Sequence, residues 1–245
     1  MINKIMLAIQ FLTIIPAPAA MVSKEEYHKV MGWFPMAGLL VGTFSAMIYW
    51  VGLQILPLEI VVILVLITQF IMTGGLHLDG LADTFDGCMS GRDLQRKLEI
   101  MKDSRLGTHG AVILLFVMLL KFTSLLLMPA TVRTLVILLA PVVGRFALVL
   151  GAWKATYARD KGLGNLFIGV IDTKDMVTAF ILLLICLLIY PKAYISLAIV
   201  IPGIVFCKKI VNSILGGMTG DTLGALNEMS ESLFMIVLLI LVNWR

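Results

Sequence analysis

The chain has 245 residues, of which 60% are hydrophobic and only 14% are charged. Soluble domains carry about 25% charged residues, so this composition excludes a soluble globular protein and indicates one embedded in a lipid bilayer. The net charge of +4 does not indicate a nucleic-acid partner, because the basic residues fall in loops that face a membrane surface.

The N-terminal segment MINKIMLAIQFLTIIPAPAA resembles a cleavable signal peptide, because it has one lysine, then a short apolar run, and alanines at its end. Gln10 and Thr13 interrupt that apolar run, so we expect the segment to be retained. Residues 2–15 are too few to span a bilayer, and we predict that they lie in the interface or enter the helical bundle.

Crossing the hydrocarbon takes about 20 helical residues, and about seven stretches are candidates. They are residues 31–56, 58–73, 109–128, 133–153, 176–190, 193–211 and 232–244. The last is short and is expected to continue a helix that begins near Asp221. The sequence therefore predicts a single all-α domain over residues 1–245, a polytopic bundle of about seven transmembrane helices, with six or eight as alternatives.

Basic residues are distributed very unevenly between the two predicted sides of the membrane. The N-terminus and the loops 74–108, 154–175 and 208–231 hold 14 lysines and arginines, and the opposite side holds three, namely Arg133, Lys192 and Arg245. Such loops face the cytoplasm. The polar residues discussed next all belong to that side, so we expect an active site that faces the cytoplasm.

The first acidic motif is LHLDGLADTFDG, residues 76–87. Asp79, Asp83 and Asp86 fall within about 60° of arc on a helix, so their carboxylates share one face. The preceding Gly74 and Gly75 can break the span and make the motif a re-entrant segment or a separate helix. Carboxylates crowded at a membrane edge favour a hard cation, above all Mg²⁺. The alternative is a solvated helix end paired with the nearby Arg92, Arg96 or Lys97.

A second acidic motif, GGMTGDTLGALNEMSE, lies about 130 residues further on. We predict that Asp221 joins the first motif in one metal-binding cleft, and that Gly224 lets another helix approach closely. Glu228 and Glu231 either belong to this cleft or only decorate a helix that enters the bilayer. His77 in the first motif is a candidate metal ligand or proton shuttle.

Cations near these motifs suit a phosphorylated substrate. We predict that Lys102, Arg105, Arg145 and Arg159 bind phosphate, since arginine matches phosphate oxygens and neighbouring glycines expose backbone N–H groups. For Lys102 and Arg105 the alternative is anchoring to lipid headgroups. Asp103 is a candidate metal ligand, general base or ion-pair partner of Arg105, and the sequence does not choose among them.

Four motifs in order carry a family resemblance: GGLHLDGLADTFDG, LEIMKDSRLGTHGAV, YARDKGLGNLF and GGMTGDTLGALNE. Together with LAIQFLTIIPAP and WFPMAGLLVG near the N-terminus, they resemble the adenosylcobinamide-GDP ribazoletransferases, the membrane-bound cobalamin synthases. The resemblance covers essentially the whole chain. Many members have an acid where Leu78 stands here, so position 78 is not expected to be an essential ligand.

The resemblance implies a reaction and its setting. Such enzymes join adenosylcobinamide-GDP to α-ribazole, or to its 5′-phosphate, and release GMP in the last steps of cobalamin nucleotide-loop assembly. They are multi-pass, Mg²⁺-dependent proteins of the bacterial inner membrane, acting as homo-oligomers or with other cobalamin-assembly enzymes. By this implication the catalytic and metal-binding residues are Asp79, Asp83 and Asp86, with Asp103 as a further catalytic candidate and Asp221 as a further metal ligand.

Two other functions fit part of the pattern. A CDP-alcohol phosphatidyltransferase also uses several aspartates at the membrane edge of its helices. A cation transporter would have acids near the middle of its spans and often internal inverted repeats. The predicted spans are nearly free of acids and show no clear repeat, which favours an enzyme. A membrane scaffold would leave the glycine-flanked acids unexplained.

Overall fold

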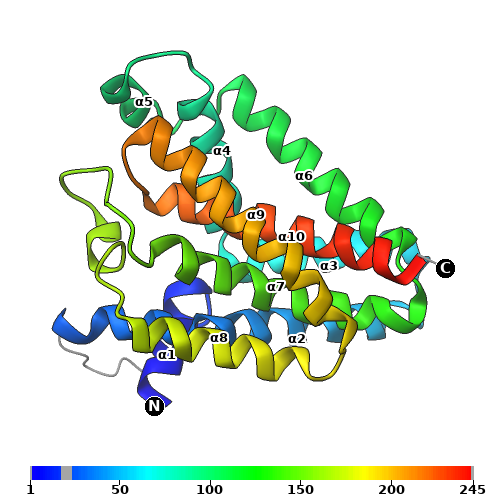
Figure 1. Ribbon diagram of the computed structural model, residues 1–245. Coiled ribbons are helices and arrows are strands. Elements are labelled where there is room, and N and C mark those ends of the chain that lie inside the picture. Colours follow the sequence, from blue (N-terminus) through cyan, green and yellow to red (C-terminus); the bar gives the residue numbers. More distant parts are fainter. Residues whose placement is uncertain (1, 18–23, 244–245) are drawn as a thin grey trace.

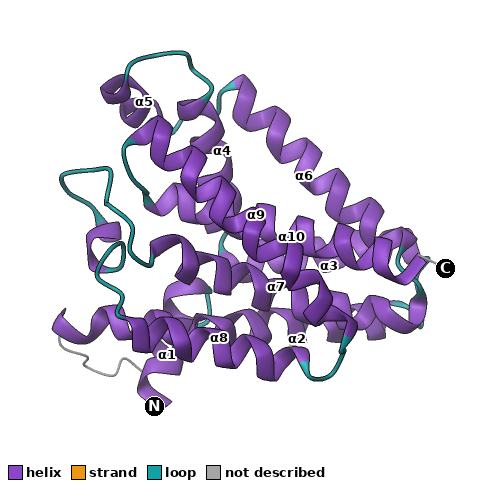
Figure 2. Ribbon diagram, in the orientation of Figure 1, coloured by secondary structure: helices purple, strands orange, loops and turns teal. Residues whose placement is uncertain are grey.

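The computed structural model describes residues 2–17 and 24–243. Within them the chain is helical and forms no β-strand (Figure 2), which confirms the all-α prediction. The α-helices are α1 (Ile2–Leu12), α2 (Phe34–Gly52), α3 (Leu58–Thr73), α4 (Leu76–Cys88), α5 (Leu94–Ile100), α6 (Thr108–Leu127), α7 (Ala130–Ala152), α8 (Thr173–Leu187), α9 (Lys192–Leu215) and α10 (Gly220–Asn243). Two 3₁₀ helices, η1 (Lys24–Trp33) and η2 (Leu163–Leu166), complete the set.

By length and apolar composition, five helical stretches in the described residues can cross a membrane, and a sixth is formed if the bent pair α3 and α4 counts as one span. The five contain α2, α6, α7, α9 and α10. The upper count agrees with the predicted alternative of six, and the central prediction of about seven exceeds it because α8 has only 15 residues. The last helix begins at Gly220, as expected from the sequence, while Trp244 and Arg245 lie outside the described residues.

Helix α7 is the centre of the bundle. In its most apolar stretch 89% of the residues are buried, against 22% in α9 and 28% in α6, whose apolar faces suit contact with lipid. Helices α2, α7 and α8 lie side by side, and α10 packs against α4, α7 and α9 (Figure 1). The core is thus built around α7, with α2 and α10 as its main neighbours.

The two ends of the bundle differ in character. Short turns join α2 to α3, α6 to α7 and α8 to α9 at one end, on the right in Figure 1. There the guanidinium of Arg133 donates to the carbonyl oxygens of Leu125, Leu126 and Met128 and to the Tyr49 hydroxyl, and so satisfies carbonyls at the end of α6. Longer loops, α4 and α5 occupy the other end, which agrees with the predicted sidedness.

Helix α1 enters the loop-bearing end of the bundle. Its residues Leu7, Ala8 and Leu12 are buried, and the backbone N–H of Ile14 donates to the carbonyl of Met72 at 2.8 Å. Of the two predictions for residues 2–15, the structure confirms that the segment enters the helical bundle.

Candidate active site

A double-glycine turn sets the position of the first acidic motif. Gly74 and Gly75 have φ values of +60° and +73°, a left-handed backbone that glycine adopts without a side-chain clash. The turn bends the chain so sharply that α3 and α4 meet at 87°. The predicted break is thus confirmed, and α4 forms a separate helix at the loop-bearing end. Its Asp79 is exposed and its Asp83 half-buried.

Helix α4 crosses α10 at a point where both helices have glycine. A Cβ added to Gly80 would lie 2.7 Å from the carbonyl oxygen of Asp221, and one added to Gly224 would lie 3.2 Å from the carbonyl oxygen of His77. The two backbones therefore touch directly, as the sequence predicted for Gly224. This contact brings the two acidic motifs together: Asp83 lies within electrostatic reach of both Asp79 and Asp221.

Arg159 is held in the same place by a loop-to-loop contact. The N–H of Met218 donates to the carbonyl of Thr156 at 2.8 Å, and the N–H of Ala158 donates to the carbonyl of Met218 at 2.9 Å. The guanidinium of Arg159 then donates to the Asp221 carboxylate at 2.6 Å. The structure thus brings a predicted phosphate-binding residue to a predicted metal ligand.

These residues line a cleft of about 310 Å³ between α1, α4, α10 and the loop after α7. One part of its wall is polar and consists of His77, Asp79, Tyr157, Arg159 and Asp221. The rest of the wall is mostly apolar. Burial raises the pKa of Tyr157 above its ordinary value, so this phenol stays neutral at physiological pH and offers a hydrogen bond. A cleft that combines carboxylates, one arginine and apolar surface is typical of a small-molecule site.

Asp86 occupies a different position from the other acids of its motif. Its two carboxylate oxygens accept hydrogen bonds from the N–H groups of Gly107 and Gly110, at 2.8 and 2.9 Å, at the start of α6. A carboxylate at a helix N-terminus satisfies unpaired N–H groups and suits the helix dipole. Asp86 is buried and does not line the cleft, so its position favours fixing α6 to α4 over the predicted catalytic and metal-binding roles.

Asp103 and Arg105 bind each other in the loop between α5 and α6. The Arg105 guanidinium donates to both carboxylate oxygens of Asp103, at 2.6 to 3.1 Å, and both groups are exposed to solvent. This bond holds the pKa of Asp103 at about 2. Of the roles left open by the sequence, the ion pair is the one that the structure contains. Lys102 is exposed in the same loop, and neither cation lines the cleft.

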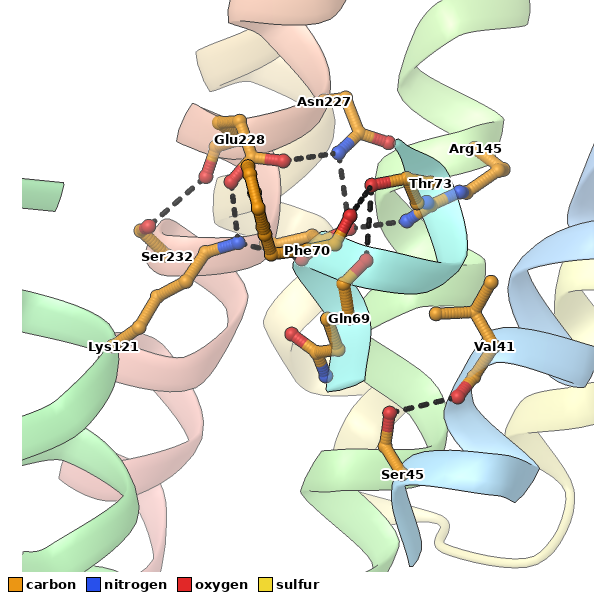
Figure 3. Close-up of polar contacts among 11 residues, drawn as sticks. Val41, Ser45, Gln69, Phe70, Thr73, Lys121, Arg145, Asn227, Glu228 and Ser232 are labelled. Atoms are coloured by element: carbon orange, nitrogen blue, oxygen red, sulfur yellow. Dashed lines mark hydrogen bonds and ion pairs between the residues drawn. The ribbon is translucent and has the colours of Figure 1, made fainter. Parts of the chain in front are cut away.

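Arg145 does not reach the cleft either. Deeper in the bundle, Lys121 Nζ contacts Glu228 and Glu231 at 2.6 and 2.7 Å, and the Arg145 guanidinium contacts Glu231 at 2.6 Å (Figure 3). Asn227 donates to both glutamates at 3.0 Å. All four charged side chains are buried, and their charges cancel. Arg145 therefore has the carboxylate partner that an intramembrane arginine needs, and its predicted phosphate-binding role stays a prediction.

The sequence did not predict this buried network as a unit. Glu228 and Glu231 were predicted only as acids that either belong to the cleft or decorate a helix. The signal was present in Lys121, a second cation inside a predicted span, because two cations in apolar spans require two buried acids nearby.

The acidic side chains at the cleft are candidate ligands for the implied magnesium ion. No three His, Cys, Asp or Glu side chains in the described parts of the chain form a group able to hold a metal by themselves. Magnesium, however, is normally bound through one or two carboxylates together with substrate phosphates and water. Asp79 and Asp221 line one cleft, and Asp83 lies close enough to interact electrostatically with both of these carboxylates. These residues fit an ion that binds with a diphosphate.

Comparison with known proteins gives a consistent result. A family model described as cobalamin-5-phosphate synthase matches residues 4–239. Proteins named adenosylcobinamide-GDP ribazoletransferase are similar over most of their length. The one from Clostridium novyi is 38% identical over 241 residues, covering 97% of this chain and 96% of the relative. The one from Thermoanaerobacter sp. is 34% identical over 238 residues, covering 94% of each.

A relative of the same name from Citrobacter koseri is 38% identical over 225 residues, which cover 88% of this chain and 89% of the relative. No solved structure matches the chain.

Proposed function

The chain belongs to the cobalamin-5-phosphate synthase family, and we propose that it joins adenosylcobinamide-GDP to α-ribazole, or to its 5′-phosphate, with release of GMP in a Mg²⁺-dependent reaction. As a member of this family it is a transferase of cobalamin biosynthesis. The observation that carries the mechanistic part of the proposal is the convergence of Asp79, Asp83, Asp221 and Arg159 where α4 crosses α10.

The charges at the cleft suit a diphosphate. Three carboxylates, Asp79, Asp83 and Asp221, face one guanidinium, that of Arg159. Such an excess of negative charge opposes binding of a diphosphate unless a cation accompanies it. Within the described residues neither the Asp79 nor the Asp83 carboxylate has a hydrogen bond or an ion pair, so both are available to such a cation.

In the proposed reaction a hydroxyl oxygen of the ribazole ribose attacks the phosphorus that carries the cobinamide arm. The new P–O bond forms as the bond to the bridging oxygen breaks, and GMP leaves with the electron pair. Asp79 and Asp221 would hold magnesium, which when bound would neutralise charge on the diphosphate and on the leaving group, and Asp83 would remain free of the metal. Arg159 binds a phosphate oxygen and orients it.

The proton of the attacking hydroxyl requires an acceptor. Asp83 is half-buried beside two other carboxylates, which makes it a better general base than a carboxylate held in an ion pair. Positioning and charge neutralisation supply most of the rate in phosphoryl transfer, so the fixed geometry of α4 and α10 is the main contribution of the fold. The excess of lysine and arginine at this end supports a cytoplasmic site in the bacterial inner membrane.

The test uses the full chain purified in detergent, incubated with adenosylcobinamide-GDP, α-ribazole and Mg²⁺. Chromatography is then used to follow GMP and the cobalamin product. Asp79→Asn is expected to lower turnover by on the order of 100-fold or more while the protein stays folded. Asp160→Asn, an exposed change outside the cleft, is the matched control. Absence of product with either form of the ribazole would overturn the proposed function, and an unchanged rate in Asp79→Asn would remove that residue from the site.

A further inference from the structure

The cleft has two halves of different chemistry. Its polar half contains the carboxylates of α4 and α10 and the guanidinium of Arg159. The other half is apolar and comes from α1, η1, α2, α7 and the segment around η2. Its large side chains are Phe11, Leu12, Met31, Phe34, Leu148 and Phe167. A ligand that fills this cleft therefore carries phosphate at one end and a flat or apolar group at the other.

Three phenylalanine rings from distant parts of the chain meet in the apolar half. Phe11 and Phe34 are stacked with ring centres 5.9 Å apart and planes 15° apart. Phe167 lies 4.9 Å from Phe11 and 6.2 Å from Phe34 in tilted geometry. Phe34 and Phe167 are buried, whereas Phe11 remains 38% exposed. Phe11 is thus the ring that a ligand can reach, and the other two hold it in place.

An unpartnered histidine lies on the same cleft. His77 is 3% exposed, and its Nε2 has no hydrogen-bond partner. A buried polar atom without a partner carries a free-energy cost.

We infer that the aromatic half of the cleft binds the heterocyclic base of the acceptor nucleoside, with the base against Phe11 and the ribose toward the polar half. The inference rests on the proposed function and names the substrate that this half of the cleft receives. Guanine, the other base in the reaction, has a polar edge that needs hydrogen-bonding groups. The apolar half offers phenylalanine, leucine and methionine, which suit an apolar aromatic base.

The test measures initial rates of GMP release by the full chain in detergent with Mg²⁺, varying each substrate while the other is saturating. Phe11→Leu is expected to raise the KM for α-ribazole about 2- to 10-fold, the worth of one aromatic contact, and to change the KM for adenosylcobinamide-GDP less than twofold. Phe11→Tyr keeps the ring face and should restore the low KM. Phe44→Leu is the matched control, since Phe44 is 43% exposed on α2 and lies outside the cleft.

Free benzimidazole serves as a probe of the same half. We expect it to inhibit competitively with α-ribazole and not with adenosylcobinamide-GDP, and we expect Phe11→Leu to weaken that inhibition. A rise confined to the KM for adenosylcobinamide-GDP would assign the rings to guanine and overturn the inference. Unchanged KM values in an active Phe11→Leu protein would overturn it too. A wild-type protein that forms no product would instead refute the proposed function.

Discussion

The contact between α4 and α10 predicts that one methyl group at Gly80 disables the enzyme. In Gly80→Ala the added Cβ would lie 2.7 Å from the Asp221 carbonyl oxygen and 2.9 Å from the Asp221 Cα. Both are backbone atoms of a packed helix, so no side chain can turn aside to make room. The helices must separate, and the carboxylates of Asp79 and Asp83 move away from Asp221 with them.

The size of the effect follows from these distances. Ordinary contact for a Cβ begins at 3.4 Å, so α4 and α10 must part by about 0.7 Å at the crossing. Overpacking of this kind costs about 1–3 kcal/mol of stability. A misplacement of about 1 Å costs on the order of 100-fold in rate. We therefore expect Gly80→Ala to lose about 10- to 100-fold in kcat while remaining folded.

Gly220→Ala is the matched control for this prediction. Gly220 begins the same helix and precedes Asp221, yet a Cβ there meets no atom within 4 Å. We expect this variant to keep a wild-type unfolding midpoint in detergent; because Gly220 lines the cleft, it controls for the stability of α10 and not for kcat. GMP release and thermal unfolding measure the two quantities on the same preparations. A Gly80→Ala protein with wild-type kcat would show that the crossing does not set the geometry of the site.

Three further changes test the assignment of the charged residues. Arg159→Ala should raise the KM for adenosylcobinamide-GDP about 10- to 100-fold, because a charge-assisted hydrogen bond contributes about 1.5–3 kcal/mol. Lys121→Met should destabilise the bundle by about 3–5 kcal/mol, read as a lower unfolding midpoint, because it leaves two buried carboxylates with one cation. Asp103→Asn should retain activity and its pH profile above pH 4, since a carboxyl with a pKa of about 2 is a poor general base.

Each of these changes has its own check. Lys161→Ala, close to Arg159 but exposed, should leave the KM unchanged, and an equal effect of both changes would argue for nonspecific attraction. Adding Glu228→Gln to Lys121→Met restores the charge balance and should recover part of the lost stability.

The sign of the pH effect at Asp103 is fixed by the direction of its shift. Its pKa in the folded protein lies below the ordinary value of 3.8, so the stability contributed by its ion pair is fully present above pH 4. That contribution is lost as the pH falls toward 2. A fall in the activity of Asp103→Asn at pH 7 would therefore indicate a role other than the ion pair with Arg105.

The elements that the sequence predicted well are those with a strong local signal. Long apolar runs marked α2, α6, α7 and α9, and Gly74–Gly75 marked the break before α4 because few other residues adopt that backbone. The meeting of α4 and α10 could also be predicted, since Gly224 allows close approach and both acidic motifs follow a double glycine. The central prediction of seven spans exceeded the count of up to six, because the run 176–190 is apolar but its helix α8 has only 15 residues.

The roles of individual charged residues were harder to predict. Helical periodicity places Asp86 on the same face as Asp79, but it does not reveal that the start of α6 lies against Asp86 and takes up its carboxylate. Likewise, the sequence indicated that Arg145 needs an anionic partner without distinguishing a substrate phosphate from Glu231. Such partners come from elements distant in the sequence, and only packing decides between them.

The contact between the loops at Thr156 and Met218 is made by main-chain atoms alone. Side-chain replacements at the exposed Thr156 leave both hydrogen bonds intact, whereas Met218 is fully buried in the core and its side chain is constrained by packing. Insertions and deletions are another matter: one residue more or fewer between Thr156 and Arg159 would carry the guanidinium away from Asp221. The loop from Thr156 to Arg159 is therefore expected to tolerate substitution at Thr156 and to resist changes of length.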